Sequence, residues 1–254
     1  MRELALVAVG VLSGVLGPVG GVMSLVSFPA LLLLGTPPLA ANAANTIAVA
    51  TPGAIGASIG YRRTLREQPP RLLAAMMACA AAAGAAGAIL VLRMGEAAFT
   101  ATVPVLLIGG SALILAQPWL MRLLARRRGG HPPPHPLLAV AVTIPVAVYG
   151  GYFGVGAGVV FLSAYLAVLT HDVHTANAVK SLVGATPNLL ASAVFLLVWA
   201  RGELPLDWSD ITCLMIGSLA GGVLGVRVAR LLPVAALRVS IACCGVAAAL
   251  IALR

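Results

Sequence analysis

The sequence predicts an all-α integral membrane protein built from two related halves. Hydrophobic residues make up 61% of the chain and charged residues only 9%, whereas about a quarter of residues are charged in soluble domains. The mean hydropathy is +1.05. Apolar runs of about 20 residues, enough to cross a hydrocarbon core about 30 Å thick, follow one another along the chain. A pattern of glycines and amides in the first half returns about 135 residues later, which indicates an internal duplication.

Eight apolar segments can be marked, four in each half, with short connections between them. They cover residues 4–34, 40–61, 71–93, 98–121, 137–169, 175–200, 208–230 and 233–253. We expect a first membrane repeat over 1–128, a proline-rich linker over 129–136 and a second membrane repeat over 137–254, without a soluble domain. The N-terminal apolar run continues into the repeated glycine pattern, so we expect it to be retained rather than cleaved as a signal peptide.

The first segment of each half is long and is interrupted by glycines. Its pieces cover 4–16 and 22–34 in the first half, and 138–150 and 158–169 in the second. A helix of about 13 residues spans only about 20 Å, so the pieces predict half-membrane helices. If each pair turns back as a re-entrant hairpin, the second half is inverted relative to the first. If each pair continues across the membrane, the two halves are parallel.

Arginines gather in two loops, after the second and the fourth segments, and we expect both loops in the cytoplasm. Either arrangement places 11 arginines on the cytoplasmic side of the membrane and 4 on the other side, so the positive-inside rule does not distinguish the inverted from the parallel arrangement. We favour inverted-topology repeats, because broken helices that meet near the midplane are a recurrent plan of transporters. The arginines lie at segment ends, so the net charge of +9 indicates topology rather than nucleic-acid binding.

Small residues in the later segments predict close helix packing. Gly217, Gly221 and Gly225 follow one another at four-residue steps, and Gly84 and Gly87 lie in an alanine-rich stretch. Such patterns let helix backbones approach one another in a membrane. The four cysteines lie within apolar runs without metal or disulfide spacing, so we expect them to be packing residues.

The glycine interruptions are the first candidate for binding chemistry. They allow positive φ angles, and the half-helix after each one presents free N–H groups and the positive end of its dipole, which suits an anion. The alternative is that the glycines only permit a tight turn, but the repetition of the pattern favours a site. The expected substrate-binding glycines are Gly17, Gly20, Gly21, Gly154, Gly156 and Gly158.

A polar set opens the second segment of each half. Asn42 and Asn45, like Asn177 and Lys180, are three residues apart and share a helix face. Lys180 is the single lysine of the chain. It either faces the ligand, which we favour, or snorkels to the interface. The expected substrate-binding residues here are Asn42, Asn45, Thr46 and Thr51 in the first half and Asn177, Lys180, Ser181, Thr186 and Asn188 in the second.

The acidic residues all lie at segment ends or in loops, so we expect no carboxylate in mid-membrane. This argues against a carboxylate proton relay, a sodium cage built on Asp or Glu, and an intramembrane aspartyl protease. The chain contains no His-Glu-x-x-His, Gly-x-Ser-x-Gly or P-loop motif. We expect the histidines at 171 and 174 to be solvated, and we predict no catalytic residue, no metal site and no cofactor.

These motifs resemble the TauE/SafE family of sulfite and organosulfonate exporters over essentially the whole chain. The likeness rests on the glycine break and the Ala-x-x-Thr/Ser segment of each half, and on Gly-Glu-Leu-Pro-Leu-Asp-Trp at 202–208. Pro18, Val19 and Ala157 depart from the denser glycine run of the family, and no Ile-Asp element follows Arg63. These departures favour unequal contributions of the two halves to one site.

The resemblance implies a multi-pass transporter of the inner (plasma) membrane that exports small sulfur oxyanions or sulfonates, such as sulfite, sulfoacetate or thiosulfate. The residues themselves also indicate a negatively charged substrate, because half-helix N-termini, neutral donors and one lysine suit an anion. Each negative charge leaving an inside-negative cell gains about 2.3 kcal/mol per 100 mV, so a divalent anion could be expelled without a coupling ion, and we expect an uncoupled or lightly coupled carrier. A passive anion channel and a non-transporting assembly subunit are the alternatives. We expect a lipid environment and no nucleic-acid partner, and we leave open a homo-oligomer.

Overall fold

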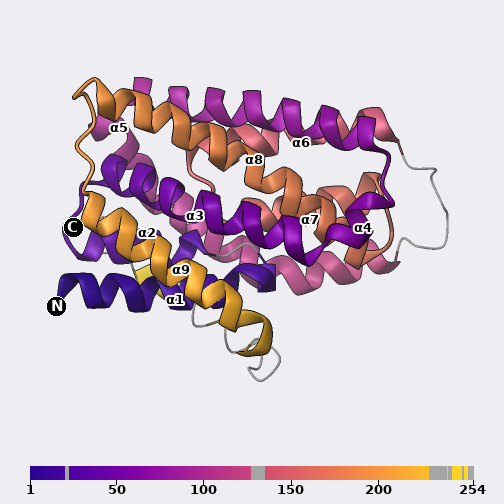
Figure 1. The fold of residues 1–254 in the computed structure, drawn as a ribbon, viewed down its shortest axis with the longest axis horizontal. Coiled ribbons are helices and arrows are strands. Elements are labelled where there is room, and N and C mark those ends of the chain that lie inside the picture. The colour runs from indigo at the N-terminus through magenta and orange to yellow at the C-terminus, as the bar shows by residue number, and fades with distance from the viewer. Residues whose placement is uncertain (21–22, 127–134, 229–238, 240–241, 248, 251–254) are drawn as a thin grey trace.

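The computed structural model describes residues 1–20, 23–126, 135–228, 239, 242–247 and 249–250, and these form helices and no strands (Figure 1). The helices are α1 (Arg2–Gly20), α2 (Ser24–Leu33), α3 (Pro38–Gly60), α4 (Arg62–Arg66), α5 (Pro70–Arg126), α6 (Pro136–Tyr152), α7 (Ala157–Val168), α8 (Val173–Ala200) and α9 (Trp208–Val228). The all-helical class is confirmed for this part of the chain. Most of the predicted segment 233–253 and of the linker 129–136 lies outside the described residues.

α5 consists of two helices joined at Gly95, which has φ 76° and ψ 167°. Glycine adopts this conformation readily, whereas side chains rarely do. The first arm of α5 covers 70–94 and the second arm covers 96–126. They correspond to the predicted segments 71–93 and 98–121.

Both broken runs fold back on themselves. At the start of α1, the guanidinium of Arg2 donates to the backbone carbonyl of Leu34, which follows α2, at 3.1 Å. At the start of α6, the backbone N–H of His135 donates to the carbonyl of Val168, the last residue of α7, at 3.2 Å. We refer to α1 with α2 as the first hairpin and to α6 with α7 as the second hairpin.

The two hairpins open at opposite ends of α3. The first hairpin opens where α3 begins, shortly after α2 ends. The far end of α3 is followed by Tyr61, whose ring contacts His174 in the first turn of α8 at a centroid distance of 5.5 Å. Because α8 follows α7 directly, the open end of the second hairpin lies beside Tyr61. In Figure 1, α3 runs lengthwise through the molecule between these two ends.

Glycines let helix backbones touch where α1 packs on α9 and where α6 packs on the first arm of α5. A Cβ on Gly221 would lie 2.8 Å from backbone carbon atoms of Val11, and a Cβ on Gly87 would lie 2.7 Å from the backbone nitrogen of Tyr152. Only glycine permits such an approach. The close packing is thereby confirmed for Gly84, Gly87, Gly217 and Gly221. Gly225 lies outside the described side chains.

The four cysteines are free thiols, and only part of the expectation about them holds. Cys79 and Cys213 are half-buried among neighbouring helices, as packing residues would be. Cys243 and Cys244 are exposed on the chain. The expectation of a buried packing role is wrong for these two, because an apolar segment of a membrane protein also presents residues to lipid.

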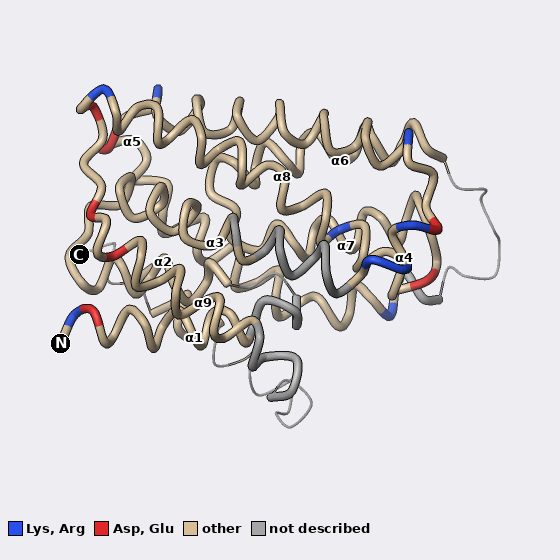
Figure 2. The backbone as a smooth tube through the Cα atoms, in the orientation of Figure 1, with Lys and Arg blue, Asp and Glu red and all other residues tan. Residues whose placement is uncertain are grey.

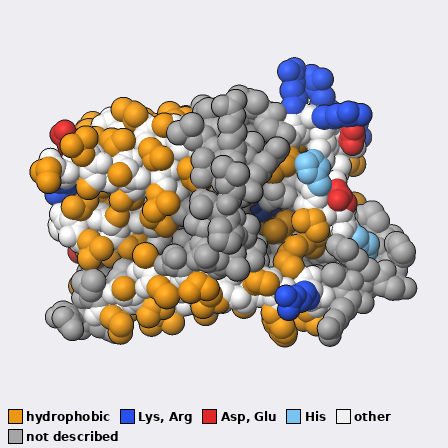
Figure 3. All heavy atoms as spheres, turned by 90° about the horizontal axis from the view of Figure 1, so that it is seen from below, with side chains coloured by type: hydrophobic (Ala, Val, Ile, Leu, Met, Phe, Trp, Pro, Cys, Tyr) orange, Lys and Arg blue, Asp and Glu red, His pale blue; other side chains and the backbone are white. Residues whose placement is uncertain are grey.

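Most of the Lys, Arg, Asp and Glu residues lie toward the two ends of the molecule, and the stretch between them carries few of them (Figure 2). Among the described residues, α8 and the 70–123 part of α5 are long and apolar enough to cross a membrane, and three shorter apolar helices accompany them. Large apolar side chains face outward, such as Val105 and Trp119 at 72% and 65% exposure. Apolar side chains likewise cover much of the face seen in Figure 3. Such a surface is typical of a protein surrounded by lipid chains.

Candidate substrate-binding site

The break between α6 and α7 is a short turn tied to Tyr149. The N–H groups of Phe153 and Gly154 both donate to the carbonyl of Tyr149 at 3.0 Å, and the Tyr149 hydroxyl donates to the carbonyl of Val155 at 2.5 Å. Gly154 and Gly156 have φ angles of 75° and 76°. These left-handed conformations explain why the turn needs glycine at both positions.

The N-terminus of α7 begins at this turn and offers fewer free donors than the sequence suggests. Gly156 is its N-cap and provides no side-chain cap. The N–H of Ala157 donates to Gly154 at 3.2 Å, and that of Val159 donates to Gly156 at 3.0 Å. Among the described residues, the first-turn N–H of Gly158 remains without such a bond. The turn can therefore assist anion binding, but it does not provide a full ring of donors.

The first break lies later than predicted. α1 continues through Gly17 to Gly20, so these two glycines belong to a helix, and the next described helix, α2, begins at Ser24. Glycine and proline are tolerated inside membrane helices, which explains why Pro18 does not end α1. Gly21 and the side chain of Thr51 lie outside the described residues.

The second hairpin meets the first inside the protein. The ring of Phe153, in the turn, lies 5.0 Å from the ring of Phe28 on α2 and 6.0 Å from that of Phe99 on α5, in edge-to-face contacts. All three rings are buried. The two hairpins therefore touch through a buried aromatic cluster.

Asn42 joins α3 to the second hairpin. Its Nδ2 donates to the carbonyl of Tyr152, at the end of α6, at 3.0 Å. This contact fixes the orientation of the amide, because a carbonyl can only accept. The Oδ1 of Asn42 is buried and has no hydrogen-bond partner among the described residues. Asn42 therefore anchors the turn between α6 and α7, and its Oδ1 remains an unused hydrogen-bond acceptor among the described residues.

Asn45 is held by the first hairpin. The Oγ of Ser27 on α2 lies 2.5 Å from the side-chain amide of Asn45 and 3.0 Å from the carbonyl of Met23, and both side chains are buried. Because a hydroxyl carries one hydrogen and a carbonyl can only accept, Ser27 donates to one of these two partners. Sequence reasoning missed Ser27, although a serine within the apolar piece 22–34 was a signal that could have found it. One end of the Asn45 amide is engaged by Ser27, and the other end is the group left for a ligand.

The position that corresponds to Asn45 in the second half is Lys180, on α8. Lys180 is only 6% exposed. No acceptor is bonded to its ammonium group within the part of the chain that the structure describes. Snorkelling would carry the ammonium to an exposed position. The burial therefore favours an orientation toward the interior.

The remaining predicted residues differ in what they can offer. The hydroxyls of Thr46 and Thr186 donate to carbonyls of their own helices, at 2.8 and 3.2 Å, so they present only lone pairs. Asn177 donates from Nδ2 to the hydroxyl of Tyr61 at 2.5 Å. Ser181 is half-buried on α8. Asn188 is half-buried and lies beside the turn, with its Oδ1 4.0 Å from the place of a Cβ on Gly154.

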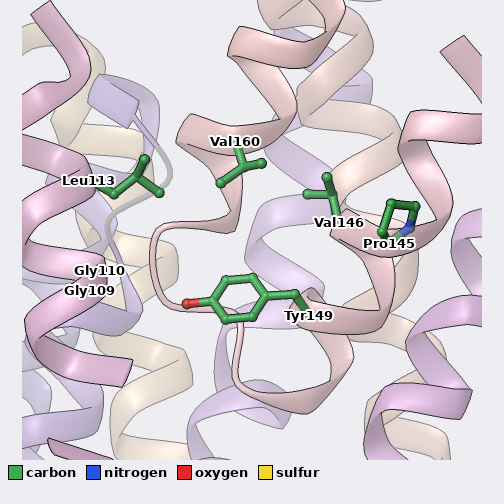
Figure 4. A pocket seen from close by; sticks show the side chains of 7 residues that line it. All are labelled: Gly109, Gly110, Leu113, Pro145, Val146, Tyr149 and Val160. Carbon is green, nitrogen blue, oxygen red and sulfur yellow. The ribbon is translucent and has the colours of Figure 1, made fainter. Parts of the chain in front are cut away.

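A groove of about 440 Å³ lies between the second arm of α5 and the second hairpin (Figure 4). Its lining consists of Gly109, Gly110, Leu113, Pro145, Val146, Tyr149 and Val160. The Tyr149 hydroxyl is bonded to Val155, so the groove offers an anion neither a charge nor a free donor. We do not assign the substrate to it.

Comparison with known proteins agrees with a membrane transporter. Residues 4–252 match the family described as "Sulfite exporter TauE/SafE". The chain is 27% identical over 222 residues to a "Probable membrane transporter protein" of Haemophilus influenzae, which covers 87% of this chain and 83% of that protein. No solved structure matches the chain. The resemblance seen in the sequence motifs is confirmed, because the match spans nearly all residues: the chain belongs to the TauE/SafE sulfite exporter family, a family of membrane transporters and not a class of enzymes.

Proposed function

We propose that the protein is a multi-pass transporter of the inner (plasma) membrane that exports small sulfur-containing anions, such as sulfite, sulfoacetate or related sulfonates. The family supplies the class of transporter. The observation that carries the binding site is Lys180, a lysine at 6% exposure within the long apolar helix α8. A buried cation without a bonded carboxylate is costly, and an anion bound beside it lowers that cost.

We propose further that residues 1–128 and 137–254 form inverted repeats, joined by the linker 129–136. The support comes from the two hairpins, which fold back at opposite ends of α3 and touch through Phe28 and Phe153. A site between such repeats can be exposed to the two sides in turn when one repeat rocks against the other.

The two repeats contribute unequal groups to the proposed site. Asn45 is paired with Ser27, whereas the corresponding Lys180 has no such partner among the described residues. We assign the charge of the anion to Lys180 and neutral hydrogen bonds to the end of the Asn45 amide that Ser27 does not engage and to Asn188. The turn that contains Gly154 closes one side. This assignment gives the site one positive group and several neutral donors, which suits a small oxyanion.

Uptake of radiolabelled sulfite into proteoliposomes tests this proposal. Lys180→Met keeps the length of the side chain and removes its charge. Because a hydrogen bond to a charged group contributes about 1.5–3 kcal/mol, the half-saturating sulfite concentration should rise about tenfold or more. Lys180→Arg, which keeps the charge, should show a smaller rise. An unchanged half-saturation in Lys180→Met would exclude the role of Lys180.

Two further measurements separate the alternatives. Flux that grows linearly with concentration, without exchange, would favour a passive channel, and the absence of any flux would favour a non-transporting assembly subunit. A thermal-shift screen of the purified protein against sulfite, sulfate, thiosulfate, sulfoacetate and taurine would identify the anion, since a ligand that binds the native state raises its melting temperature.

A further inference from the structure

One face of α8 leads from the surface to Lys180. His174, Asn177 and Lys180 follow one another at three-residue steps and therefore lie close together on the helix. His174 is exposed, Asn177 is half-buried and Lys180 is buried. Burial thus increases along this face from the start of α8 toward the interior, as it would along an entrance to a buried site.

Tyr61, between α3 and α4, lies against the same face. The Nδ2 of Asn177 donates to its hydroxyl oxygen at 2.5 Å. Its ring makes an edge-to-face contact with the ring of His174, with centroids 5.5 Å apart. These two contacts place the half-buried phenol between the exposed and the buried parts of the face. Sequence reasoning missed Tyr61, because it lies at the end of its segment, outside the repeated polar pattern.

The end of the molecule beside Tyr61 is positively charged. Arg62, Arg63 and Arg66 of α4 follow Tyr61 directly and are exposed. Figure 2 shows basic positions at the label of α4 near one end of the molecule, and Figure 3 shows basic and histidine side chains, with a few acidic ones, gathered at one end. Exposed positive charges raise the local concentration of anions over about one Debye length, ~10 Å. An anion gathered here meets Tyr61 and Asn177 on the way to Lys180.

The hydrogen of the Tyr61 hydroxyl is available to such an anion. The oxygen already accepts from Asn177, and within the described part of the chain no acceptor is bonded to the hydrogen. A hydroxyl that accepts one hydrogen bond becomes a stronger donor in the next, and bonds from neutral donors to anions are among the strong ones.

We propose that Tyr61 contacts the transported anion at the arginine-rich entrance, where its hydroxyl donates a hydrogen bond to the anion as it passes to or from Lys180. Asn177 acts as a positioning residue that holds the phenol in this place. This inference rests on the proposed function and adds to it a substrate contact supplied by the first half of the chain, opposite the Lys180 of the second half.

The test uses Tyr61→Phe, which removes only the hydroxyl and keeps the ring against His174. In proteoliposomes, the half-saturating concentration of radiolabelled sulfite should rise about tenfold or more. Tyr165→Phe is the control, because it removes a hydroxyl that bonds Thr143 within the second hairpin, at 2.9 Å. The control should leave the half-saturating concentration unchanged.

The outcomes are distinct. An unchanged half-saturating concentration in Tyr61→Phe overturns the proposal even when the maximum rate falls, because a packing role alone lowers only the rate. If the wild type shows saturable flux and Tyr61→Phe matches it, this inference fails and the proposed function stands. If the wild type shows no sulfite flux at all, the inference about Tyr61 and the proposed function are both excluded.

A second variant tests the positioning role, and its effect in the wild-type background does not depend on the folding of Tyr61→Phe. Asn177→Ala should raise the half-saturating concentration in the wild-type background. It should add little in the Tyr61→Phe background, because residues that act through one contact are not additive. Full additivity of the two substitutions would overturn the role of Asn177 as a positioning residue, and no effect of Asn177→Ala alone would do the same.

Discussion

Gly221→Ala should force α1 and α9 apart and destabilise the protein. The added Cβ would overlap the carbonyl oxygen of Val11 and would lie 2.8 Å from its backbone carbon atoms. Carbon atoms in contact lie about 3.5–4.0 Å apart, so the helices must separate by about 1 Å or more. Overpacking costs about 1–3 kcal/mol, and we expect the upper end because a backbone cannot rotate away. The better helix propensity of alanine offsets about 1 kcal/mol, which leaves a net loss of about 2 kcal/mol.

Gly222→Ala is the matched control, because at this adjacent glycine of the same helix no heavy atom of the described residues lies within 4 Å of the added Cβ. It should leave stability unchanged or raise it by up to about 1 kcal/mol. Thermal unfolding in detergent measures both variants. For a chain of this size, 1 kcal/mol corresponds to about 2–4 °C, so Gly221→Ala should melt about 4–8 °C below the wild type. Equal melting temperatures of the two variants would refute the backbone contact between α1 and α9.

The remaining predictions concern the two hairpins. Asp210→Asn removes a carboxylate that is 1% exposed and binds Arg2 at 2.5 Å, so we expect a loss of about 1.5–3 kcal/mol, seen as a lower melting temperature. Arg63→Ala breaks the ion pair of Arg63 with Glu67, whose side chains are 97% and 65% exposed. This variant should melt like the wild type, because an exposed ion pair contributes little to stability. Equal losses of stability in Asp210→Asn and Arg63→Ala would contradict the argument that burial makes the difference. Tyr149→Phe removes the bond to the carbonyl of Val155. The backbone amides of 153–158 should then exchange hydrogen faster, because the free energy that protects them from exchange falls by about 1 kcal/mol. Unchanged exchange there would mean that the hydroxyl does not hold the turn.

The helical class and the second break could be predicted because both depend on local properties. A bilayer offers no hydrogen-bond partners to the backbone, so the length of each apolar run is nearly enough to mark a helix. The pieces predicted at 138–150 and 158–169 correspond to α6 and α7, which end at Tyr152 and begin at Ala157. The first break was placed too early, because glycines and a proline that are compatible with a membrane helix resemble glycines that end one.

The composition and motifs of the chain by themselves determined its class, the approximate helices and the family, since each is a property of a continuous stretch of residues. Only the tertiary structure decided that each broken run turns back, a point on which the arginine count was evenly divided. The contacts that show it join the two ends of each run, Arg2 to Leu34 and His135 to Val168. Contacts between more distant residues then assemble the helices: Arg2 reaches Asp210 across 208 positions, and Asn177 reaches Tyr61 across 116. The tertiary structure likewise decided which amides and hydroxyls remain free for a ligand, because a hydrogen bond depends on proximity in space and not on the register of a repeat.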